Sequence, residues 1–339
     1  MSIAFRQATP RSAVPQGRRG FHRKTPLVPI RIEVGDESRL VWAKLEGENP
    51  AGSVKYRTAL SLLEGLVEQR RLRPGQTLVE STSGNLGLAL SYLAHVGGWR
   101  FHAIVDPKSP PYYLRRIAEY EAEYEVVDRA DEHGNYLQAR LDRVAELSSS
   151  SDHYVWPNQY ASTDNPKAHF RGTAPELAQQ TNGALDAVFV AVSTGGTLAG
   201  IARYMRRAKP EVRIVGVDAR GSVVFGSEPG PRRLTGIGST RQSRFIESWM
   251  YDDHVLVADT EAFAACRALD SIGVDVGGSS GAVFAACARY LERHPEIRFP
   301  VCICADGHEP YAQTIYDDEW LGNQLAAVNS GWDTRVERA

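Results

Sequence analysis

The sequence is poor in cysteine and has no long hydrophobic run. Its only cysteines are Cys266, Cys287, Cys302 and Cys304, and none of them forms a Cys-x-x-Cys pair. Because no histidine cluster accompanies them, we predict four reduced thiols in a cytoplasmic protein, with no disulfide and no metal site. No apolar run approaches the roughly 18 residues that cross a bilayer, and the N-terminus lacks the apolar stretch of a secretory signal.

The sequence also has no excess of charge of either sign. Its formal net charge of -2 offers no electrostatic reason to expect nucleic acid or an anionic membrane as a partner. Basic residues gather only in residues 1–24, which contain no acidic residue and no apolar periodicity. We expect this segment to be a disordered basic arm and residues 326–339 to be a loose C-terminal tail.

Between these ends, short apolar runs alternate with helical patterns. This alternation indicates an α/β fold with two doubly wound domains, mainly parallel sheets, and an active site in the cleft between them. The expected strands cover residues 76–80, 101–105, 124–127, 187–192, 213–217, 254–258 and 301–305. The expected helices cover residues 54–69, 85–96, 110–120, 135–147, 168–180, 197–208, 260–272 and 281–293.

A lysine follows turn-forming residues at the start of the first expected helix. In ENPAGSVKYR (48–57), Ser53 is expected to cap the helix, which places Lys55 in its first turn. The helix dipole disfavours a positive charge at this end, and imine chemistry needs a lysine of lowered pKa. Taken alone, Lys55 is equally well read as an ordinary surface lysine.

Two polar, glycine-containing segments join a strand to a helix. In ESTSGNLG (80–87), hydroxyls, an amide and free backbone N–H groups suit a carboxylate. In VSTGGTLAG (192–200), two glycines flanked by threonines suit a phosphate monoester. The second segment is neither G-x-G-x-x-G nor a lysine-bearing P-loop. Each segment alone is also compatible with an ordinary turn.

A fourth segment, VGGSSGAVFAA (276–286), leads through small residues into an apolar helix. A serine hydroxyl that faces a pyridine nitrogen hydrogen-bonds it but cannot hold a proton there as an aspartate would. This arrangement favours elimination over chemistry that needs a stronger electron sink. Alone, Ser279 is equally well explained as a helix cap.

In this order, the four segments resemble the fold-type II pyridoxal-phosphate enzymes of the cysteine synthase and cystathionine β-synthase family, whose fold is tryptophan synthase β-like. The resemblance extends from about Thr25 to Leu321. It implies pyridoxal 5′-phosphate bound as a Schiff base to Lys55, with Asn85 at the ring hydroxyl and Ser279 at the pyridine nitrogen. It also implies a phosphate-binding segment made of Ser193, Thr194, Gly195, Gly196 and Thr197.

The resemblance further implies a domain division and a binding site for amino-acid substrates. A smaller domain with a mobile subdomain is expected at 45–155, and a larger cofactor-binding domain at 25–44 plus 156–325. A homodimer is expected. The residues that would take the substrate carboxylate are Thr82, Ser83 and Gln159.

Some segments look like one branch of this family, for example GVDARGSVVFG (216–226) and LTGIGS (234–239). That branch makes N-(2-amino-2-carboxyethyl)-L-glutamate from O-phospho-L-serine and L-glutamate, toward 2,3-diaminopropionate in siderophore or antibiotic biosynthesis. Its phosphate leaving group needs a cation or several donors, for which we expect Arg140. Tyr160 and Ser193 would shape the pocket, and a solvated Arg140 is the alternative.

Two departures from the family pattern leave other functions open. Tyr56 stands where an aspartate normally follows the lysine, and DGHEPY (306–311) replaces a segment of the Gly-Glu/Asp-Arg-Tyr type. One alternative is a cysteine or cystathionine synthase that uses a sulfur nucleophile. The other is a non-catalytic binding protein, against which Lys55 argues because binding alone needs no imine-forming amine.

Overall fold

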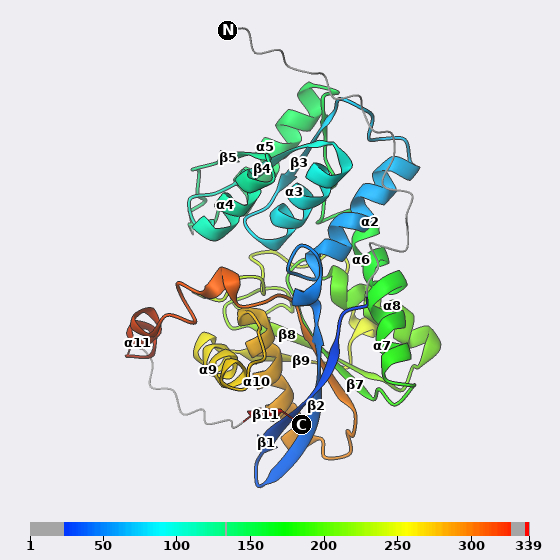
Figure 1. Cartoon of the computed structure of the whole chain (residues 1–339), viewed down its shortest axis with the longest axis vertical. Helices are drawn as coiled ribbons and strands as arrows, with labels where there is room; N and C mark the ends of the chain where they lie inside the picture. The colour runs from blue at the N-terminus through cyan, green and yellow to red at the C-terminus, as the bar shows by residue number, and fades with distance from the viewer. Residues whose placement is uncertain (1–23, 133, 327–335, 339) are drawn as a thin grey trace, which may run out of the picture.

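The computed structural model describes residues 24–132, 134–326 and 336–338. The expected basic arm, except its last residue, and most of the expected tail lie outside the described part of the chain. In the described part, two sheets lie one beyond the other along the long axis of the molecule (Figure 1).

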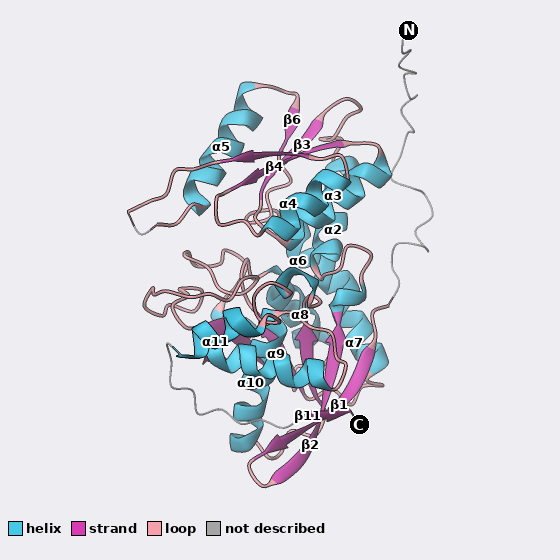
Figure 2. Ribbon diagram, turned by 60° about the vertical axis from the view of Figure 1, so that its left-hand side comes forward, coloured by secondary structure: helices cyan, strands magenta, loops and turns pink. Residues whose placement is uncertain are grey.

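The smaller sheet is parallel throughout and has the strand order β5-β4-β3-β6. Val144 of α5 packs against Val79 and Ile104 on one face, and α2, α3 and α4 build the core on the other face (Figure 2). Its strands are β3 (Thr77–Ser81), β4 (Arg100–Val105), β5 (Glu123–Val126) and β6 (Tyr154–Val155). Its helices are α2 (Lys55–Glu68), α3 (Asn85–Gly97), α4 (Pro111–Glu119) and α5 (Leu137–Ser150).

The larger sheet has the order β11-β1-β2-β10-β7-β8-β9 and is parallel from β2 to β9. Helices α9 and α10 cover one face, and α7 and α8 cover the other. Its strands are β1 (Leu27–Val34), β2 (Glu37–Leu45), β7 (Ala187–Ala191), β8 (Arg213–Ala219), β9 (Asp253–Val257), β10 (Pro300–Cys304) and β11 (Val336–Arg338). The remaining helices are α6 (Asp164–Ala168), α7 (Ala174–Gln180), α8 (Gly196–Ala208), α9 (Asp259–Ser271), α10 (Gly278–Arg293) and α11 (Asp318–Ala326), with short turns η1 (Glu46–Glu48), η2 (His169–Thr173), η3 (Ser248–Met250) and η4 (Glu309–Tyr311).

These two layered sheets confirm the predicted α/β fold class. Strands buried on both faces read as short apolar runs, so their positions follow from the sequence. The small sheet uses only strands between residues 77 and 155, whereas β1 and β2 precede it in the chain but belong to the large sheet. The domain boundaries themselves stay a prediction.

The edge of the larger sheet differs from the expectation. β1 and β2 form an antiparallel hairpin around Gly35-Asp36, where Gly35 has a φ of +59°. A glycine-led two-residue turn is a hairpin signal that the expected strands did not include. β11 pairs with the open edge of β1, so the prediction of a loose tail is wrong for Val336–Arg338.

The helix expected over residues 168–180 is present, but it begins earlier and is not α-helical throughout. The chain forms α6, then the π-helical turn η2, and then α7, whose first turn contains Pro175. Proline lacks a backbone N–H, and its ring crowds the carbonyl four residues earlier. The wider π-helical turn accommodates this residue and places His169 toward α8.

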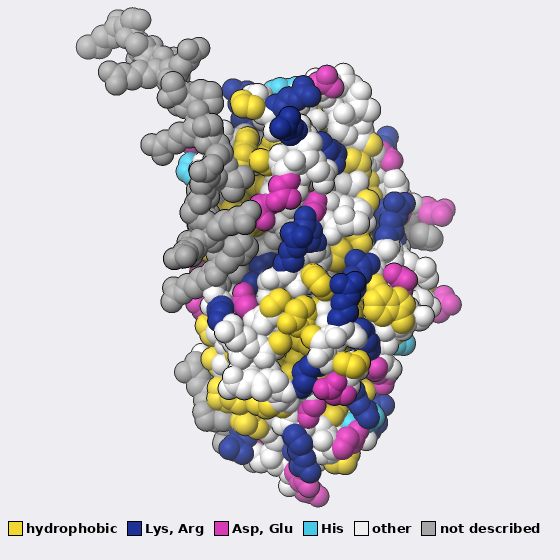
Figure 3. Space-filling view, turned by 90° about the vertical axis from the view of Figure 1, so that its right-hand side faces the viewer, with side chains coloured by type: hydrophobic (Ala, Val, Ile, Leu, Met, Phe, Trp, Pro, Cys, Tyr) yellow, Lys and Arg dark blue, Asp and Glu magenta, His cyan; other side chains and the backbone are white. Residues whose placement is uncertain are grey.

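The surface carries charges of both signs. On the face drawn in Figure 3, basic, acidic and apolar side chains are interspersed. Among the helices described, none is long and apolar enough to cross a bilayer.

Candidate active site

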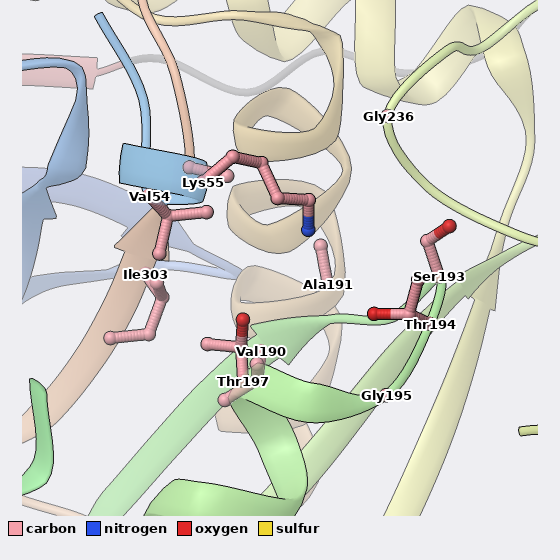
Figure 4. A pocket seen from close by; sticks show the side chains of 11 residues that line it. Val54, Lys55, Val190, Ala191, Ser193, Thr194, Gly195, Thr197, Gly236 and Ile303 are labelled. Carbon is pink, nitrogen blue, oxygen red and sulfur yellow. The ribbon is translucent and has the colours of Figure 1, made fainter. Parts of the chain in front are cut away.

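A cavity opens at the carboxyl ends of β7 and β10, between Lys55 and the segment 193–197. Figure 4 shows the Lys55 amine extending from the start of α2 toward Ser193 and Thr194. Ligands of parallel sheets bind at this end of the strands, where loops and helix N-termini meet. The lining residues are Val54, Lys55, Val190, Ala191, Ser193, Thr194, Gly195, Thr197, Gly236, Ile303 and Ala305.

Lys55 is the first residue of α2, as predicted, but its surroundings differ from the expectation. Val54 precedes the helix without a side-chain cap, and the buried Ser53 hydroxyl has no hydrogen-bond partner among the described residues. The predicted Ser53 cap is therefore wrong, because the Ser53 backbone pairs instead with Asp306. Burial lowers the pKa of the Lys55 amine, and the Asp306 carboxylate partly opposes this shift.

A buried network of charges holds the first turn of α2. Arg57 contacts Glu46 at 2.6 Å and Glu176 of α7 at 2.7 Å, and Lys44 reaches Glu176 at 2.9 Å. Burial alone would raise the pKa of Glu46, but Arg57 and Lys44 bring it below its ordinary value. The helix that carries Lys55 is thus attached to the larger sheet by ion pairs.

The segment 193–197 has the backbone that an anion site requires. Gly195 has a φ of +90°, and a Cβ there would collide with Ser243 and Ile246. Among the described residues no side chain caps α8, so its first N–H groups are available to a ligand. Gly196, also predicted here, begins α8 but does not line the cavity.

Two side chains hydrogen-bond to the threonine hydroxyls of this segment. Asn165 Nδ2 lies 3.3 Å from the Thr194 hydroxyl, and His169 Nε2 lies 3.3 Å from the Thr197 hydroxyl. Burial, together with Lys55 and Arg57, lowers the pKa of His169 well below its usual range, so the ring is neutral. Neither residue is predicted from the sequence, because an isolated polar residue carries no distinctive spacing.

Ser279 and Asn85 lie at two further helix N-termini, which hydrogen bonds of Ser280 and Asn85 place beside the cavity residue Ala305 and the next residue, Asp306. The Ser279 hydroxyl, 1% exposed at the start of α10, makes no hydrogen bond to any described residue. Asn85 begins α3, and its Nδ2 donates to Asp306 Oδ2 at 2.6 Å. Because Asp306 directly follows the cavity residue Ala305, this bond brings Asn85 to the same site.

The residues expected to hold the substrate carboxylate form a neighbouring group outside the cavity lining. Thr82 Oγ1 accepts a hydrogen bond from Gly87 N, which leaves the Thr82 hydroxyl proton free to donate. Gln159 Nε2 donates to Ser81 O, and its backbone N–H donates to Glu80 at 3.0 Å. The expected Ser83 follows Thr82 on the same turn and is partly exposed.

Arg140 is not a solvated helix residue. It is 7% exposed, and its Nε lies 3.2 Å from Asp106 Oδ2. Nε and Nη1 make no hydrogen bond within the described part of the chain. Burial raises the pKa of Tyr160, whereas Arg140 and Arg241 act to lower it. Arg241, which the sequence analysis missed, lies over the Tyr160 ring at 5.7 Å.

Comparison with known proteins gives the class to which this fold and site belong. A sequence model of the family described as "Pyridoxal-phosphate dependent enzyme" matches residues 19–304. The chain belongs to this family of enzymes, and its cofactor is pyridoxal 5′-phosphate.

The similar proteins include two enzymes named N-(2-amino-2-carboxyethyl)-L-glutamate synthase. The one from Ralstonia nicotianae is 41% identical over 91% of both chains. The one from Cupriavidus metallidurans is 40% identical over 89% of this chain and 90% of its own. Among solved structures, the O-acetylserine-dependent cystathionine beta-synthase of Helicobacter pylori has a TM-score of 0.78 at 29% identity, covering 88% of this chain and 97% of its own. An O-ureido-L-serine synthase has a TM-score of 0.79 at 28% identity, covering 92% and 95%.

The residues of the site fit this cofactor. The amine of Lys55 has the lowered pKa that imine formation requires. The buried Ser279 hydroxyl has no hydrogen-bond partner in the described part of the chain, as expected for a group that meets a ligand atom. The positive φ of Gly195 and the uncapped start of α8 suit a phosphate group.

Proposed function

We propose that the protein catalyses a β-replacement in which O-phospho-L-serine and L-glutamate give N-(2-amino-2-carboxyethyl)-L-glutamate and phosphate. The cavity in which the Lys55 amine faces residues 193–197 carries this proposal, because it joins an imine-forming group to a phosphate site. The two relatives at 41% and 40% identity support the choice of substrates.

In this proposal, each cofactor contact has its own residue. Lys55 holds the cofactor covalently at rest, Asn85 faces the ring hydroxyl and Ser279 faces the pyridine nitrogen. The five residues of segment 193–197 bind the phosphate of the cofactor. The unpartnered Ser279 hydroxyl and the uncapped α8 support these roles.

The proton chemistry belongs to Lys55. The bound cofactor supplies an electron sink that makes the substrate α-proton acidic and lets the β-substituent leave. Lys55 Nζ would become a free amine once the substrate amine had replaced it on the cofactor. It would then take up the α-proton as general base, which its burial-lowered pKa favours. While Lys55 holds this proton, the bond from the β-carbon to the phosphate oxygen breaks. The glutamate nitrogen then bonds to that carbon and loses a proton, and Lys55 returns its own proton to the α-carbon.

The substrate anions have separate binding groups in this proposal. Thr82, Ser83 and Gln159 hold the carboxylate of the amino-acid substrate. Arg140, with Tyr160 and Ser193, holds the leaving phosphate. Support comes from the buried Arg140 guanidinium, whose Nε and Nη1 make no hydrogen bond to a described residue.

Arg140→Ala is therefore expected to raise the KM for O-phospho-L-serine by about tenfold or more, because a charge-assisted contact contributes about 1.5–3 kcal/mol. The matched control is Arg143→Ala on the same helix, since Arg143 pairs with Glu125 and Glu146 instead. Steady-state kinetics measure the KM for O-phospho-L-serine of both variants. An unchanged KM in Arg140→Ala, or an equal increase in Arg143→Ala, would remove Arg140 from the leaving-group site.

The main test is the visible absorption spectrum of the holoenzyme during successive additions of substrate. O-phospho-L-serine is expected to shift the cofactor band, and L-glutamate, but not sulfide, is expected to restore it. Restoration by sulfide alone would instead assign the sulfur-nucleophile reaction. Lys55→Ala should lack the starting band, while the control Lys108→Ala, which alters an exposed lysine, should keep it.

We further propose that the protein works as a cytoplasmic homodimer on a route to 2,3-diaminopropionate in siderophore or antibiotic biosynthesis. The names of the two relatives support the product, and family membership supports amino-acid substrates. Sedimentation of the holoenzyme tests the dimer, which a monomer mass at working concentration would exclude.

A further inference from the structure

A chain of hydrogen bonds through the half-buried Asn85 joins the two layers of the molecule, which are the smaller sheet with its helices and the larger sheet with its helices. The Tyr113 hydroxyl of α4 donates to Asn85 Oδ1 at 3.1 Å, and Asn85 Nδ2 donates to Asp306 Oδ2 at 2.6 Å. Tyr311 of η4 donates to the same Asp306 oxygen at 2.9 Å. Tyr113 and Asn85 belong to helices of the smaller sheet, whereas Asp306 and Tyr311 follow β10 of the larger one.

Asp306 is buried, and both its backbone and its side chain make hydrogen bonds. Asp306 is 1% exposed. Its backbone pairs with Ser53, and its carbonyl oxygen accepts a hydrogen bond from Gly277 N at 3.0 Å. A Cβ at Gly277 would collide with Asp306 Oδ1 and with the Tyr311 ring. The missing side chain of Gly277 therefore leaves the space that this carboxylate occupies.

The chemistry of the four groups fixes the direction of every bond. An ionised carboxylate only accepts hydrogen bonds, so the amide that faces Asp306 presents its NH₂ group. The amide oxygen of Asn85 then faces Tyr113, whose hydroxyl supplies the matching donor. An asparagine with no such neighbours can exchange the places of its amide oxygen and nitrogen by a half-turn of the side chain. Here that rotation would set the amide oxygen against the Asp306 carboxylate, so that two acceptors would face each other.

We propose that Asp306 and Tyr113 are positioning residues that lock the Asn85 amide with its second N–H directed at the cofactor ring oxygen. An N–H donor favours the ionised form of that oxygen, whereas an amide oxygen at the same place repels it. The hydrogen bond that Tyr113 donates to the amide oxygen also polarises the amide and strengthens its remaining N–H as a donor. The proposal rests on the role of Asn85 in the proposed function.

The same carboxylate lies near the Lys55 amine, which offers a second way for it to act. Asp306 partly opposes the lowering of the Lys55 pKa by burial. An effect of Asp306 through Lys55 does not need Asn85, whereas an effect through the amide vanishes when the amide is absent. The two routes are therefore separable by combining substitutions.

The decisive variants are Tyr113→Phe and Asp306→Asn, with Tyr112→Phe as the matched control. Tyr112 is the adjacent tyrosine and also links the two layers, through Glu309 at 2.8 Å, but makes no contact with Asn85. Titration of each apoenzyme with pyridoxal 5′-phosphate gives the cofactor affinity, and the holoenzyme spectrum gives the ratio of ionised to un-ionised ring forms. Thermal unfolding of each apoenzyme checks that it is folded.

We expect Asp306→Asn to weaken cofactor binding about tenfold and to lower the ionised fraction, as for the loss of a hydrogen bond to a charged group. Tyr113→Phe is expected to weaken binding about threefold with a spectral change of the same sign, and Tyr112→Phe to change neither. In an Asn85→Ala background, Asp306→Asn should have no further effect on the spectrum.

Several results would overturn the inference. If Tyr113→Phe behaves like Tyr112→Phe, the amide is not locked by this chain, and this result stands even where Asp306→Asn does not fold. If Asp306→Asn has its full effect in the Asn85→Ala background, Asp306 acts through Lys55. If Asn85→Ala alone changes neither affinity nor spectrum, both this inference and the assigned role of Asn85 fail, whereas the Lys55 band remains a separate test of the proposed reaction.

Discussion

At the scale of single residues, buried polar groups connect the segments around the candidate site. Glu80 is fully buried and accepts hydrogen bonds from Ser81 N, Trp156 Nε1 and Gln159 N. These three donors join the turn that carries Thr82 to the loop that carries Gln159. Burial nevertheless raises the pKa of Glu80 to about 7, because the three donors only partly replace the lost water.

This shift predicts a pH-dependent effect of Glu80→Gln. A carboxyl whose folded pKa lies above its unfolded value stabilises the fold below the unfolded pKa, near 4.5, and this contribution is lost as pH rises toward 7. Between these pH values, the free energy of unfolding of the wild type should fall relative to Glu80→Gln by roughly 2–3 kcal/mol. Urea unfolding at several pH values measures the difference. A constant difference, or the same trend in the control Glu48→Gln at an exposed carboxylate, would contradict this role.

At the scale of elements, the position of α2 depends on its buried ion pairs. Arg57 lies two residues after Lys55 and joins Glu46 to Glu176 of α7. The π-helical turn before α7 and the close packing of α6 on α8 set the place of Glu176 relative to the cavity. The position of Lys55 thus depends on residues that lie more than a hundred positions away in the sequence.

Arg57→Met should therefore destabilise the protein by about 3–5 kcal/mol, because two carboxylates then lose their shared buried cation. It should also weaken cofactor binding, since the first turn of α2 is no longer held in place. Denaturant unfolding and cofactor titration measure these two effects. The control is Arg71→Met, which changes an exposed arginine beyond the end of the same helix. It should leave the free energy of unfolding and the cofactor affinity unchanged within experimental error. Equal stability of the two variants would show that the network does not hold α2.

At the scale of the whole molecule, the site is assembled from both layers. Lys55 and Asn85 begin helices that cover the smaller sheet, and segment 193–197 and Ser279 belong to the larger one. The four cysteines lie in the larger layer, and all are free and buried. Burial raises the pKa of Cys266 to about 12 and that of Cys302 well above its ordinary value.

Thiol titration of the unreduced protein should consequently give two distinct results. The native protein is expected to react slowly, because a buried thiol is protonated and out of reach of the reagent. The unfolded protein should show four free thiols. Fewer than four in the unfolded state would reveal a disulfide, and fast reaction of the native state would contradict the burial of these side chains.

Much of the architecture follows from local sequence patterns. Apolar runs bounded by turns locate seven strands, because strands of a parallel sheet are buried on both faces. Apolar runs do not predict the β1–β2 hairpin or the π-helical turn at residues 169–173. A hairpin at a sheet edge alternates instead of forming an apolar run, and the effect of Pro175 on the preceding turn depends on packing against α8.

The sequence by itself indicated the segments of the candidate site: a lysine at a helix start, polar turns after strands, and a glycine pair at the start of α8. Backbone conformation and free N–H groups depend on nearby residues, so such features are visible locally. Only the tertiary structure decided which groups meet. The pairing of Asn85 with Asp306, the placement of His169 behind Thr197 and the burial of Arg140 join residues far apart in the chain. Contacts at such separations depend on the packing of whole layers, which leaves no periodic signal in the sequence.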